Sequence, residues 1–327
     1  MATMKILVTF PLEASDKSFV EQIARTNGFR LVFSTVSTVT EKEVSEADII
    51  LGNIPDDFLA HADRLKWYQM AKAGADKTLA SPYMREDIIL TCGSGAFGPA
   101  VAEHMLASLL ALMKNLPQYA QQQKKAEWKP ITQRRGLHGA HVLIVGYGDL
   151  GSAFARMVLA LGAHVTGVRR RPVSLHETLD PSVQVIGFDN LDSYIPEADV
   201  VALCLPATPQ TYHLFSREKL LAMKKDAYIV NGGRGDAIDV EELAAVLEAG
   251  HLAGAALDVT EPEPLPIQHP LWKAPRLLLT PHVAGGYGLP HTRETIGRIM
   301  VDNLKRFLEG QPLTHTVDRV TGYRSKD

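Results

Sequence analysis

The sequence predicts an α/β protein with two domains, each a parallel sheet with helices wound on both faces. Short β-branched, apolar runs alternate with amphipathic stretches along the chain, which is the pattern of buried parallel strands joined by helices. The length of 327 residues corresponds to about two domains at roughly 100–200 residues each. We therefore expect two doubly wound parallel-sheet domains with a cleft between them.

The first alternating series extends from the N-terminus to residue 92. Its expected strands are the apolar runs Lys5–Phe10, Leu31–Phe33, Asp48–Leu51, Leu65–Met70 and Ile88–Cys92. Its expected helices are residues 16–27, which Gly28 ends, residues 40–46 and residues 56–64. A glycine-rich break at residues 93–99 follows, and we expect the first α/β unit to end there.

The second series begins with one long helix, expected from Ala100 to about Lys124, and a polar stretch to residue 133. Its expected strands are residues 141–145, 164–168, 200–204, 228–230, 253–259 and 277–280. The last helix is expected at Pro290–Leu308, where Gly310 and Pro312 stop it.

The composition excludes several classes of protein. The 34 Lys+Arg and 37 Asp+Glu give a net charge of −3, whereas nucleic-acid binders need a basic surface. The two cysteines, Cys92 and Cys204, lie inside apolar runs, so we expect core residues, no disulfide framework and no metal site. Residues 6–10 are too short for a signal-peptide core, and residues 101–113 fall short of the about 20 that span a bilayer. We expect a cytoplasmic protein that binds no membrane.

A glycine-rich loop indicates a dinucleotide site. The motif Gly146-Tyr147-Gly148-Asp149-Leu150-Gly151 directly follows an expected strand and opens the helix expected at residues 152–161. In such loops the first glycine permits a tight turn, the second lets the backbone approach a pyrophosphate, and the third allows close helix–strand packing. The helix N-terminus adds partial positive charge. All six residues are candidate cofactor-binding residues, and a turn without a ligand is the alternative.

Three arginines indicate which dinucleotide is bound. Sites that prefer NAD place an acid about 20 residues after the first glycine, where it holds the ribose 2′-hydroxyl. This chain has no acid between Asp149 and Glu177, and Arg169, Arg170 and Arg171 occupy that place. Guanidinium groups bind phosphate through paired hydrogen bonds. We therefore expect NADP(H) to be preferred over NAD(H). A solvated basic loop is the alternative, and we do not expect all three arginines to contact the ligand.

Candidate catalytic side chains follow later strands. Arg234 lies in the turn after strand 228–230, and His282 ends the run that begins at Leu277. In open α/β sheets, ligands bind at this edge. Arg234 can hold a carboxylate with two hydrogen bonds, and His282 can exchange a proton with a carbonyl or alcohol oxygen, assisted by a neighbouring carboxylate. Taken singly, each residue could also be structural.

Four segments occur in the order found in the D-isomer-specific 2-hydroxyacid dehydrogenases, which this chain therefore resembles. They are Val145–Gly151, Asn231–Asp239, Ala256–Pro266 and Leu279–Gly285. The resemblance implies two Rossmann-like domains with the active site between them. The substrate-binding domain would be discontinuous, residues 1–98 plus 288–327, and the dinucleotide-binding domain would be residues 99–287. The resemblance also implies a homodimer.

The resemblance further implies roles for single residues. Arg234 would bind the substrate carboxylate and polarise the carbonyl, and His282 would be the acid/base. Glu263 would be the partner acid of His282, with Glu261 as a neighbour. The backbone amides of Gly74 and Ala75 would help to bind the substrate carboxylate. The residues expected to line the nicotinamide and ribose are Pro206, Thr211, Gly232, Asp258 and Ala284.

Together these expectations describe an NADPH-preferring reductase of small 2-oxo acids, such as glyoxylate or hydroxypyruvate. Two alternatives stay open: an NAD(P)-binding regulatory, corepressor-like protein with little catalysis, and an NAD-dependent D-2-hydroxyacid dehydrogenase for a bulkier substrate. Phosphoglycerate oxidation is less favoured because the chain ends at Asp327 without an added regulatory domain. Formate oxidation is less favoured because relatives with that activity carry Gln where this chain has Glu263.

Overall fold

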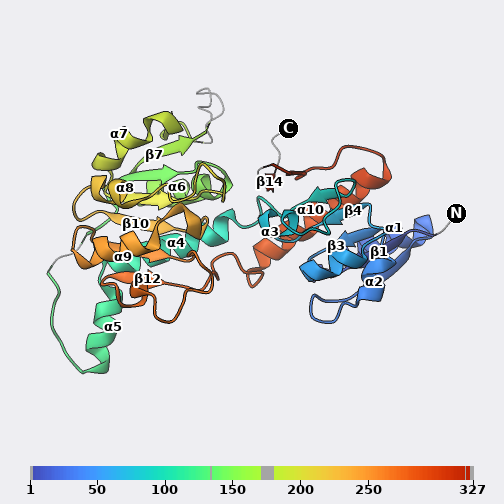
Figure 1. Cartoon of the computed structure of the whole chain (residues 1–327), viewed down its shortest axis with the longest axis horizontal. Helices are drawn as coiled ribbons and strands as arrows, with labels where there is room; N and C mark the ends of the chain where they lie inside the picture. Colours follow the sequence, from blue (N-terminus) through green and yellow to red (C-terminus); the bar gives the residue numbers. More distant parts are fainter. Residues whose placement is uncertain (1–2, 133–134, 171–179, 321, 325–327) are drawn as a thin grey trace. The chain divides into compact units, whose positions relative to one another are not determined.

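The computed structural model describes residues 3–132, 135–170, 180–320 and 322–324. The chain divides into two compact units, residues 1–97 with 287–327 and residues 98–286, whose elements are labelled in Figure 1. The predicted α/β class, with two doubly wound parallel sheets, is confirmed. No helix among the described residues is long and apolar enough to cross a membrane.

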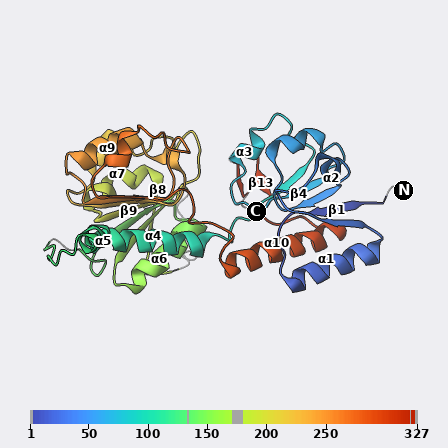
Figure 2. The same cartoon turned by 90° about the horizontal axis from the view of Figure 1, so that it is seen from below.

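The first unit is built on a five-stranded parallel sheet in the order β2-β1-β3-β4-β5. Its strands are β1 (Lys5–Val8), β2 (Arg30–Phe33), β3 (Ile49–Leu51), β4 (Trp67–Gln69) and β5 (Ile89–Thr91). Its helices are α1 (Ala14–Asn27), α2 (Glu41–Ser45), α3 (Asp76–Leu79), α10 (Pro290–Leu308) and the 3-10 helix Asp56–His61. A short antiparallel pair, β13 (Val317–Asp318) and β14 (Tyr323–Arg324), follows α10. Figure 2 shows α1 and α10 on one face of the sheet and α2 and α3 on the other.

Side chains at alternate positions of a strand point to opposite faces of the sheet, and this explains why helices cover both faces. Ile6 and Val8 of β1 pack with Ile296 and Met300 of α10, whereas Leu7 points into the core on the opposite face. All three β1 side chains are fully buried, as expected for a strand covered on both faces.

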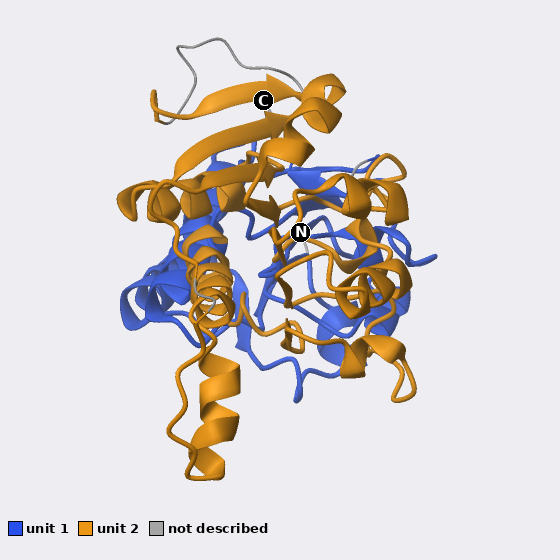
Figure 3. Ribbon diagram, turned by 90° about the vertical axis from the view of Figure 1, so that its left-hand side faces the viewer, with its two compact units in different colours: residues 1–97, 287–327 blue, residues 98–286 orange. Residues whose placement is uncertain are grey.

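Buried hydrogen bonds join the C-terminal segment to the sheet of this unit, which is blue in Figure 3. The Asn303 amide on α10 donates to Gln69 Oε1 on β4 and to the Thr314 carbonyl, both at 2.8 Å. Asn303 Oδ1 accepts from the Thr314 N–H at 2.8 Å and its hydroxyl at 3.0 Å. Because Asn303 is completely buried, these bonds fix how α10 and the following segment meet the sheet.

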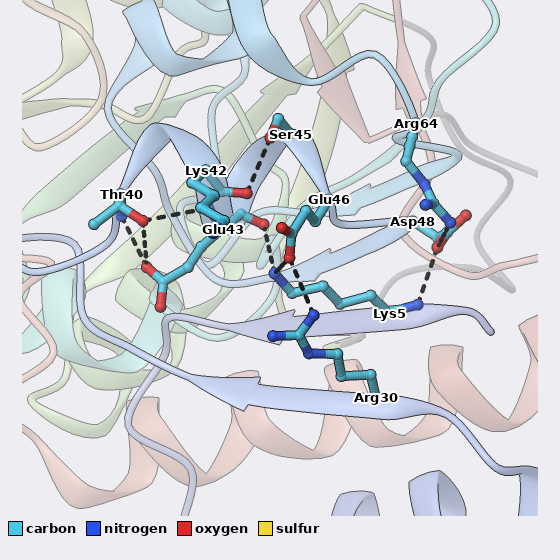
Figure 4. Close-up of polar contacts among 9 residues, drawn as sticks. All are labelled: Lys5, Arg30, Thr40, Lys42, Glu43, Ser45, Glu46, Asp48 and Arg64. Atoms are coloured by element: carbon cyan, nitrogen blue, oxygen red, sulfur yellow. Dashed lines mark hydrogen bonds and ion pairs between the residues drawn. The ribbon is translucent and has the colours of Figure 1, made fainter. Parts of the chain in front are cut away.

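A cluster of charges lies at the start of β1 and is drawn in Figure 4. The Lys5 ammonium donates to Glu46 Oε2 at 3.1 Å and to the Glu43 carbonyl at 3.2 Å, and the hydrogen bond with Lys5 lowers the pKa of Glu46. Asp48 Oδ2 accepts from the Lys5 backbone N–H at 2.9 Å and from Arg64 at 3.1 Å. Lys5 and Asp48 are buried, and a buried charge is tolerated only when it is paired in this way.

The second unit is built on a seven-stranded parallel sheet in the order β12-β11-β10-β9-β6-β7-β8. Its strands are β6 (His141–Val145), β7 (His164–Arg169), β8 (Gln184–Gly187), β9 (Val200–Leu203), β10 (Tyr228–Asn231), β11 (Gly254–Leu257) and β12 (Leu277–Leu279). Its α-helices are α4 (Gly98–Met113), α5 (Leu116–Lys124), α6 (Asp149–Ala160), α7 (Leu191–Tyr194), α8 (Arg217–Ala222) and α9 (Val240–Glu248). Its 3-10 helices are Phe188–Asn190, Ile195–Glu197, Gly235–Ala237 and Pro270–Lys273. In Figure 2, α4 and α6 cover one face of the sheet, and α7 and α9 cover the other. The strand order reverses between β6 and β9, where ligands bind in sheets of this kind.

Two sequence predictions about helices are wrong in detail. The single helix expected from Ala100 to Lys124 is two helices, because Asn115 takes a left-handed conformation (φ 56) and Pro117 lies in the first turn of α5. The helix expected at residues 56–64 is a 3-10 helix that ends at His61. By contrast, α1 ends at Asn27 before a left-handed Gly28, and α10 spans Pro290–Leu308, as predicted.

Replacing Asn303 with alanine tests the buried hydrogen bonds. We expect Asn303→Ala to lower the free energy of unfolding by about 2–4 kcal/mol, because Gln69 and the Thr314 backbone lose buried partners. Urea unfolding followed by circular dichroism measures the change. The control is Asn27→Ala, which removes an exposed side chain bonded to the Ile23 carbonyl. Equal free energies of unfolding for the two variants would contradict a stabilising role of the Asn303 hydrogen bonds.

Candidate active site

The glycine-rich loop lies between β6 and α6, at the point where the strand order reverses. The N–H groups of Gly146 and Tyr147 donate to the Val168 carbonyl on β7, at 3.1 and 2.8 Å. Gly146 has φ 101, and a Cβ there would lie 2.5 Å from the Cys204 carbonyl oxygen. At Gly151, a Cβ would lie 2.3 Å from the Gly146 carbonyl oxygen. Both glycines are therefore required for the loop to pack against the sheet.

Gly148 differs from these two glycines. It precedes the first residue of α6, and a Cβ placed there would meet no atom within 4 Å. The loop thus leaves space beside the positive N-terminus of a 12-residue helix, which suits the pyrophosphate of a dinucleotide. The residues present fit NAD(P), and the loop backbone at Gly148 and Asp149 would hold its phosphates.

Tyr147, predicted to contact the cofactor, has a buried side chain. Its ring packs on Gly167 of β7, where a Cβ would lie 2.6 Å from Tyr147 Cγ, and burial raises the pKa of the phenol. This packing leaves the Tyr147 backbone as the part that can face a bound cofactor.

Two of the three predicted phosphate-binding arginines are described. Arg169 is the last residue of β7 and is partly exposed, and Arg170 follows it and is exposed. Arg171 lies outside the described residues. Because β7 is the neighbour of β6, both side chains start from the strand end beside the glycine-rich loop.

Arg234 is held in a tight turn after β10. The Asn231 side chain donates to the Arg234 carbonyl at 2.9 Å and accepts from the Gly233 N–H at 3.0 Å. A Cβ at Gly235 would lie 2.1 Å from the Thr260 carbonyl oxygen, so the turn packs on the segment that follows β11. Arg234 itself is partly buried, and its guanidinium donates to the Gly233 carbonyl at 3.1 Å.

His282 and Glu263 form a direct pair. His282 Nδ1 lies 2.9 Å from Glu263 Oε2, and Glu263 Oε1 accepts from the Thr260 N–H at 3.2 Å. The structure thus brings the predicted acid/base and its predicted carboxylate together. Arg234, Glu263 and His282 follow the ends of β10, β11 and β12, which are adjacent in the sheet.

Asp258, predicted beside the nicotinamide, organises the segment that carries His282. Its buried carboxylate accepts from the Thr280 hydroxyl at 2.6 Å and from the N–H groups of Val283 at 3.0 Å and Ala284 at 2.9 Å. The His282 N–H donates to the Asp258 carbonyl at 2.8 Å, and His282 is left-handed (φ 53).

His104 on α4 extends this network, because its Nε2 lies 2.9 Å from the Thr280 hydroxyl. The roles of Thr280 and His104 are not evident from the sequence, because their partners are distant in the chain.

The other predicted residues are placed as follows. The buried Thr211 donates from its hydroxyl to the Pro206 carbonyl at 2.7 Å. A Cβ at Gly232 would lie 2.6 Å from Met105 Sδ. Gly74 and Ala75 belong to the first unit. The prediction that the Ala75 N–H helps to bind the substrate carboxylate is wrong, because Ala75 is buried and this N–H donates to the Gly322 carbonyl at 2.9 Å.

Neither cysteine is placed for thiol chemistry. Burial raises the pKa of Cys92 and of Cys204, so both thiols are protonated at neutral pH. Among the described residues, no group of three or more His, Cys, Asp or Glu side chains could hold a metal ion.

Comparison with known proteins gives one family. The family model described as "D-isomer specific 2-hydroxyacid dehydrogenase, NAD binding domain" matches residues 106–284. The glyoxylate reductase of Thermofilum pendens is 31% identical over 80% of this chain and 78% of the relative. The glyoxylate/hydroxypyruvate reductase B of Yersinia pestis is 32% identical over 79% of both chains. The D-3-phosphoglycerate dehydrogenase of Methanocaldococcus jannaschii is 28% identical over 96% of this chain, which spans 59% of that relative's length.

Solved structures agree with this assignment. A D-isomer specific 2-hydroxyacid dehydrogenase family protein from Aeromonas salmonicida is 32% identical with a TM-score of 0.81, covering 97% of this chain and 100% of its own. A D-isomer specific 2-hydroxyacid dehydrogenase from Xanthobacter autotrophicus, solved in complex with NADPH and MES, is 25% identical with a TM-score of 0.77. That match covers 98% of this chain and 100% of its own.

Two glycine substitutions test the loop. In Gly151→Ala the new methyl group overlaps the Gly146 carbonyl, so we expect both the melting temperature and dinucleotide affinity to fall. In Gly148→Ala it points into open space, so we expect an unchanged melting temperature and about tenfold or greater loss of affinity, because the backbone can no longer approach the pyrophosphate. Thermal unfolding and fluorescence titration with NADPH measure both quantities. Wild-type affinity in Gly148→Ala would show that no phosphate lies there.

Proposed function

This chain belongs to the D-isomer-specific 2-hydroxyacid dehydrogenase family, and we propose that it is an NADPH-preferring reductase of small 2-oxo acids, glyoxylate or hydroxypyruvate first. The family consists of oxidoreductases that bind NAD(P). The observation that carries the proposal is the 2.9 Å contact between His282 Nδ1 and Glu263 Oε2. Glu263 follows β11, which is the neighbour of β10, the strand that Arg234 follows. The glycine-rich loop lies in the same unit.

The proposed reaction assigns one task to each residue. Arg234 holds the substrate carboxylate with charge-assisted hydrogen bonds. Because a carboxylate only accepts hydrogen bonds, Glu263 fixes the proton of His282 on Nδ1, and Nε2 is left to exchange a proton with the substrate oxygen. For reduction the ring is protonated on both nitrogens: it donates the Nε2 proton to the substrate oxygen as the carbonyl becomes an alcohol, and Glu263 stabilises the ring while it is charged. A nicotinamide cofactor held by the glycine-rich loop would supply the hydride that the carbonyl carbon accepts.

The choice of NADPH rests on Arg169 and Arg170. Arg169 is the last residue of β7 and Arg170 follows it, at the place where NAD-preferring sites carry an acid, and guanidinium groups can bind a 2′-phosphate. The Xanthobacter autotrophicus relative was solved with NADPH, which supports the same choice. An NAD-dependent enzyme for a bulkier substrate is the competing proposal within the family.

Catalysis is favoured over a purely regulatory role by the same geometry. A protein that only senses a nucleotide does not need the His282–Glu263 pair near the Arg234 guanidinium. Proton transfer to a bound oxo acid does need such an imidazole–carboxylate pair. The remaining parts of the proposal are a small-molecule oxo acid as partner, a substrate-binding role for the first unit that includes Gly74, a homodimer and a cytoplasmic location.

Substitutions of the pair test the chemistry. We expect His282→Asn to lower kcat for glyoxylate about 10²- to 10⁴-fold, the contribution typical of a positioned acid/base, and Glu263→Gln to lower it less. NADPH consumption measured by absorbance gives kcat, and NADPH titration checks that the cofactor still binds. Glu248→Gln, on the exposed side of α9, is the matched control. Near wild-type turnover by His282→Asn would refute the mechanism.

Cofactor preference is tested with the two described arginines. We expect the wild type to use NADPH better than NADH, and the double variant Arg169→Ala/Arg170→Ala to raise KM for NADPH about 10- to 100-fold with little change for NADH, because only NADPH carries the 2′-phosphate. Arg217→Ala, which removes an exposed arginine paired with Glu242, is the control. Equal use of the two cofactors by the wild type would mean that these arginines form a solvated loop.

A further inference from the structure

Glu261 and Glu263 are separated by one residue but face different histidines. Glu263 pairs with His282, whereas Glu261 Oε2 lies 3.4 Å from His213 Nε2. His213 follows β9 and belongs to the same unit. The loop that carries the proposed catalytic carboxylate is therefore held by an imidazole at each of its two acids.

His213 is itself held by three further contacts. Its Nδ1 lies 3.6 Å from Asp239 Oδ2, and Asp239 also caps α9 by accepting from the Glu242 N–H at 3.2 Å. The His213 backbone N–H donates to the Asp236 carbonyl at 2.7 Å, two residues after Arg234. The ring stacks on Tyr212, with centroids 4.1 Å apart and planes 9° apart. His213 is also left-handed (φ 45), a conformation that costs energy for a residue with a side chain and persists only where its surroundings hold it.

These contacts join three segments of the candidate site at one residue. The segments are the Pro206–Thr211 loop, which precedes His213, the turn that carries Arg234, and the loop that carries Glu263. His213 is placed to fix the distance between the Arg234 turn and the Glu263 loop. Its backbone N–H bonds to the turn, and its ring contacts Glu261 of the loop at 3.4 Å. A misplacement of about 1 Å in a catalytic group can cost about 10²-fold in rate.

We infer that His213 is a positioning residue for the proposed reaction, acting through Glu261 to hold Glu263 against His282. The inference rests on the proposed function for its kinetic readout. His213 is half-buried and its two carboxylate partners are half-exposed, so its side chain adds little to the hydrophobic core. Its removal therefore perturbs the loop more than the fold.

Three substitutions of His213 separate its two contacts. A glutamine amide nitrogen can take the place of Nε2 and reach Glu261, whereas an asparagine nitrogen takes the place of Nδ1 and reaches Asp239. We expect His213→Ala and His213→Asn to lower kcat about 10- to 100-fold, with KM for glyoxylate and NADPH within about twofold, and His213→Gln to recover most of the loss. Equal kcat in the Asn and Gln variants would overturn the role of Glu261.

A double substitution tests the route. If His213 acts through Glu263, His213→Ala should cost less than about twofold in a Glu263→Gln background, because contacting residues in one network are not additive. Full additivity would overturn the inference. His251→Asn is the matched control: this partly buried histidine of the same unit bonds to the Met223 carbonyl at 2.9 Å, and its loss should leave kcat unchanged.

A measurement without turnover separates this inference from the proposed function. The ring nitrogen resonances of His282, assigned by comparison with His282→Asn, report the contact with Glu263. We expect His213→Ala to move them toward their positions in Glu263→Gln, and His213→Gln to restore them. Unmoved resonances in His213→Ala would overturn the inference. A wild-type protein that reduces no oxo acid, but shows the expected spectral change, would refute the proposed function and retain the positioning role.

Discussion

The buried carboxylate of Asp258 is the interaction on which the geometry of the candidate site most depends. A buried carboxylate is stable only when donors surround it, and Asp258 has the Thr280 hydroxyl and the N–H groups of Val283 and Ala284. These donors come from the segment after β12, whereas Asp258 follows β11. Satisfying this group therefore folds that segment over the strand end and holds His282, with its left-handed backbone, within reach of Glu263.

Parallel topology accounts for the meeting of residues that are far apart in the sequence. Because β10, β11 and β12 are adjacent and parallel, the turns that follow them lie along one edge of the sheet. Glycine lets these turns pack closely: a Cβ at Gly235 would overlap the Thr260 backbone, and one at Gly233 would lie 2.6 Å from the Leu205 backbone nitrogen. The glycines on both sides of Arg234 are thus explained by packing, independently of the role proposed for the arginine.

Whether the sequence predicts an interaction depends on how far apart its residues lie along the chain. The ends of α1 and α10 follow from Gly28 and Pro290 through local backbone rules, and the buried strands follow from apolar runs. The break at Asn115 was missed because asparagine is not an obligatory left-handed residue. The contact of His104 with Thr280 joins residues 176 positions apart, and only the folded sheet brings them together. The pair His282–Glu263 came from family resemblance, since spacing alone does not distinguish Glu263 from Glu261.

The fold makes that distinction through the backbone. One oxygen of Glu263 accepts from the Thr260 N–H, which turns the other toward His282. Glu261 lies on the other side of Pro262 and reaches His213. A proton-exchanging ring needs a partner acid that keeps its place while the charge on the ring changes, because preorganised groups avoid reorganisation during the reaction. In the proposed reaction, anchoring the loop at a second imidazole would meet this need without a further carboxylate beside His282, which would compete for the same ring proton.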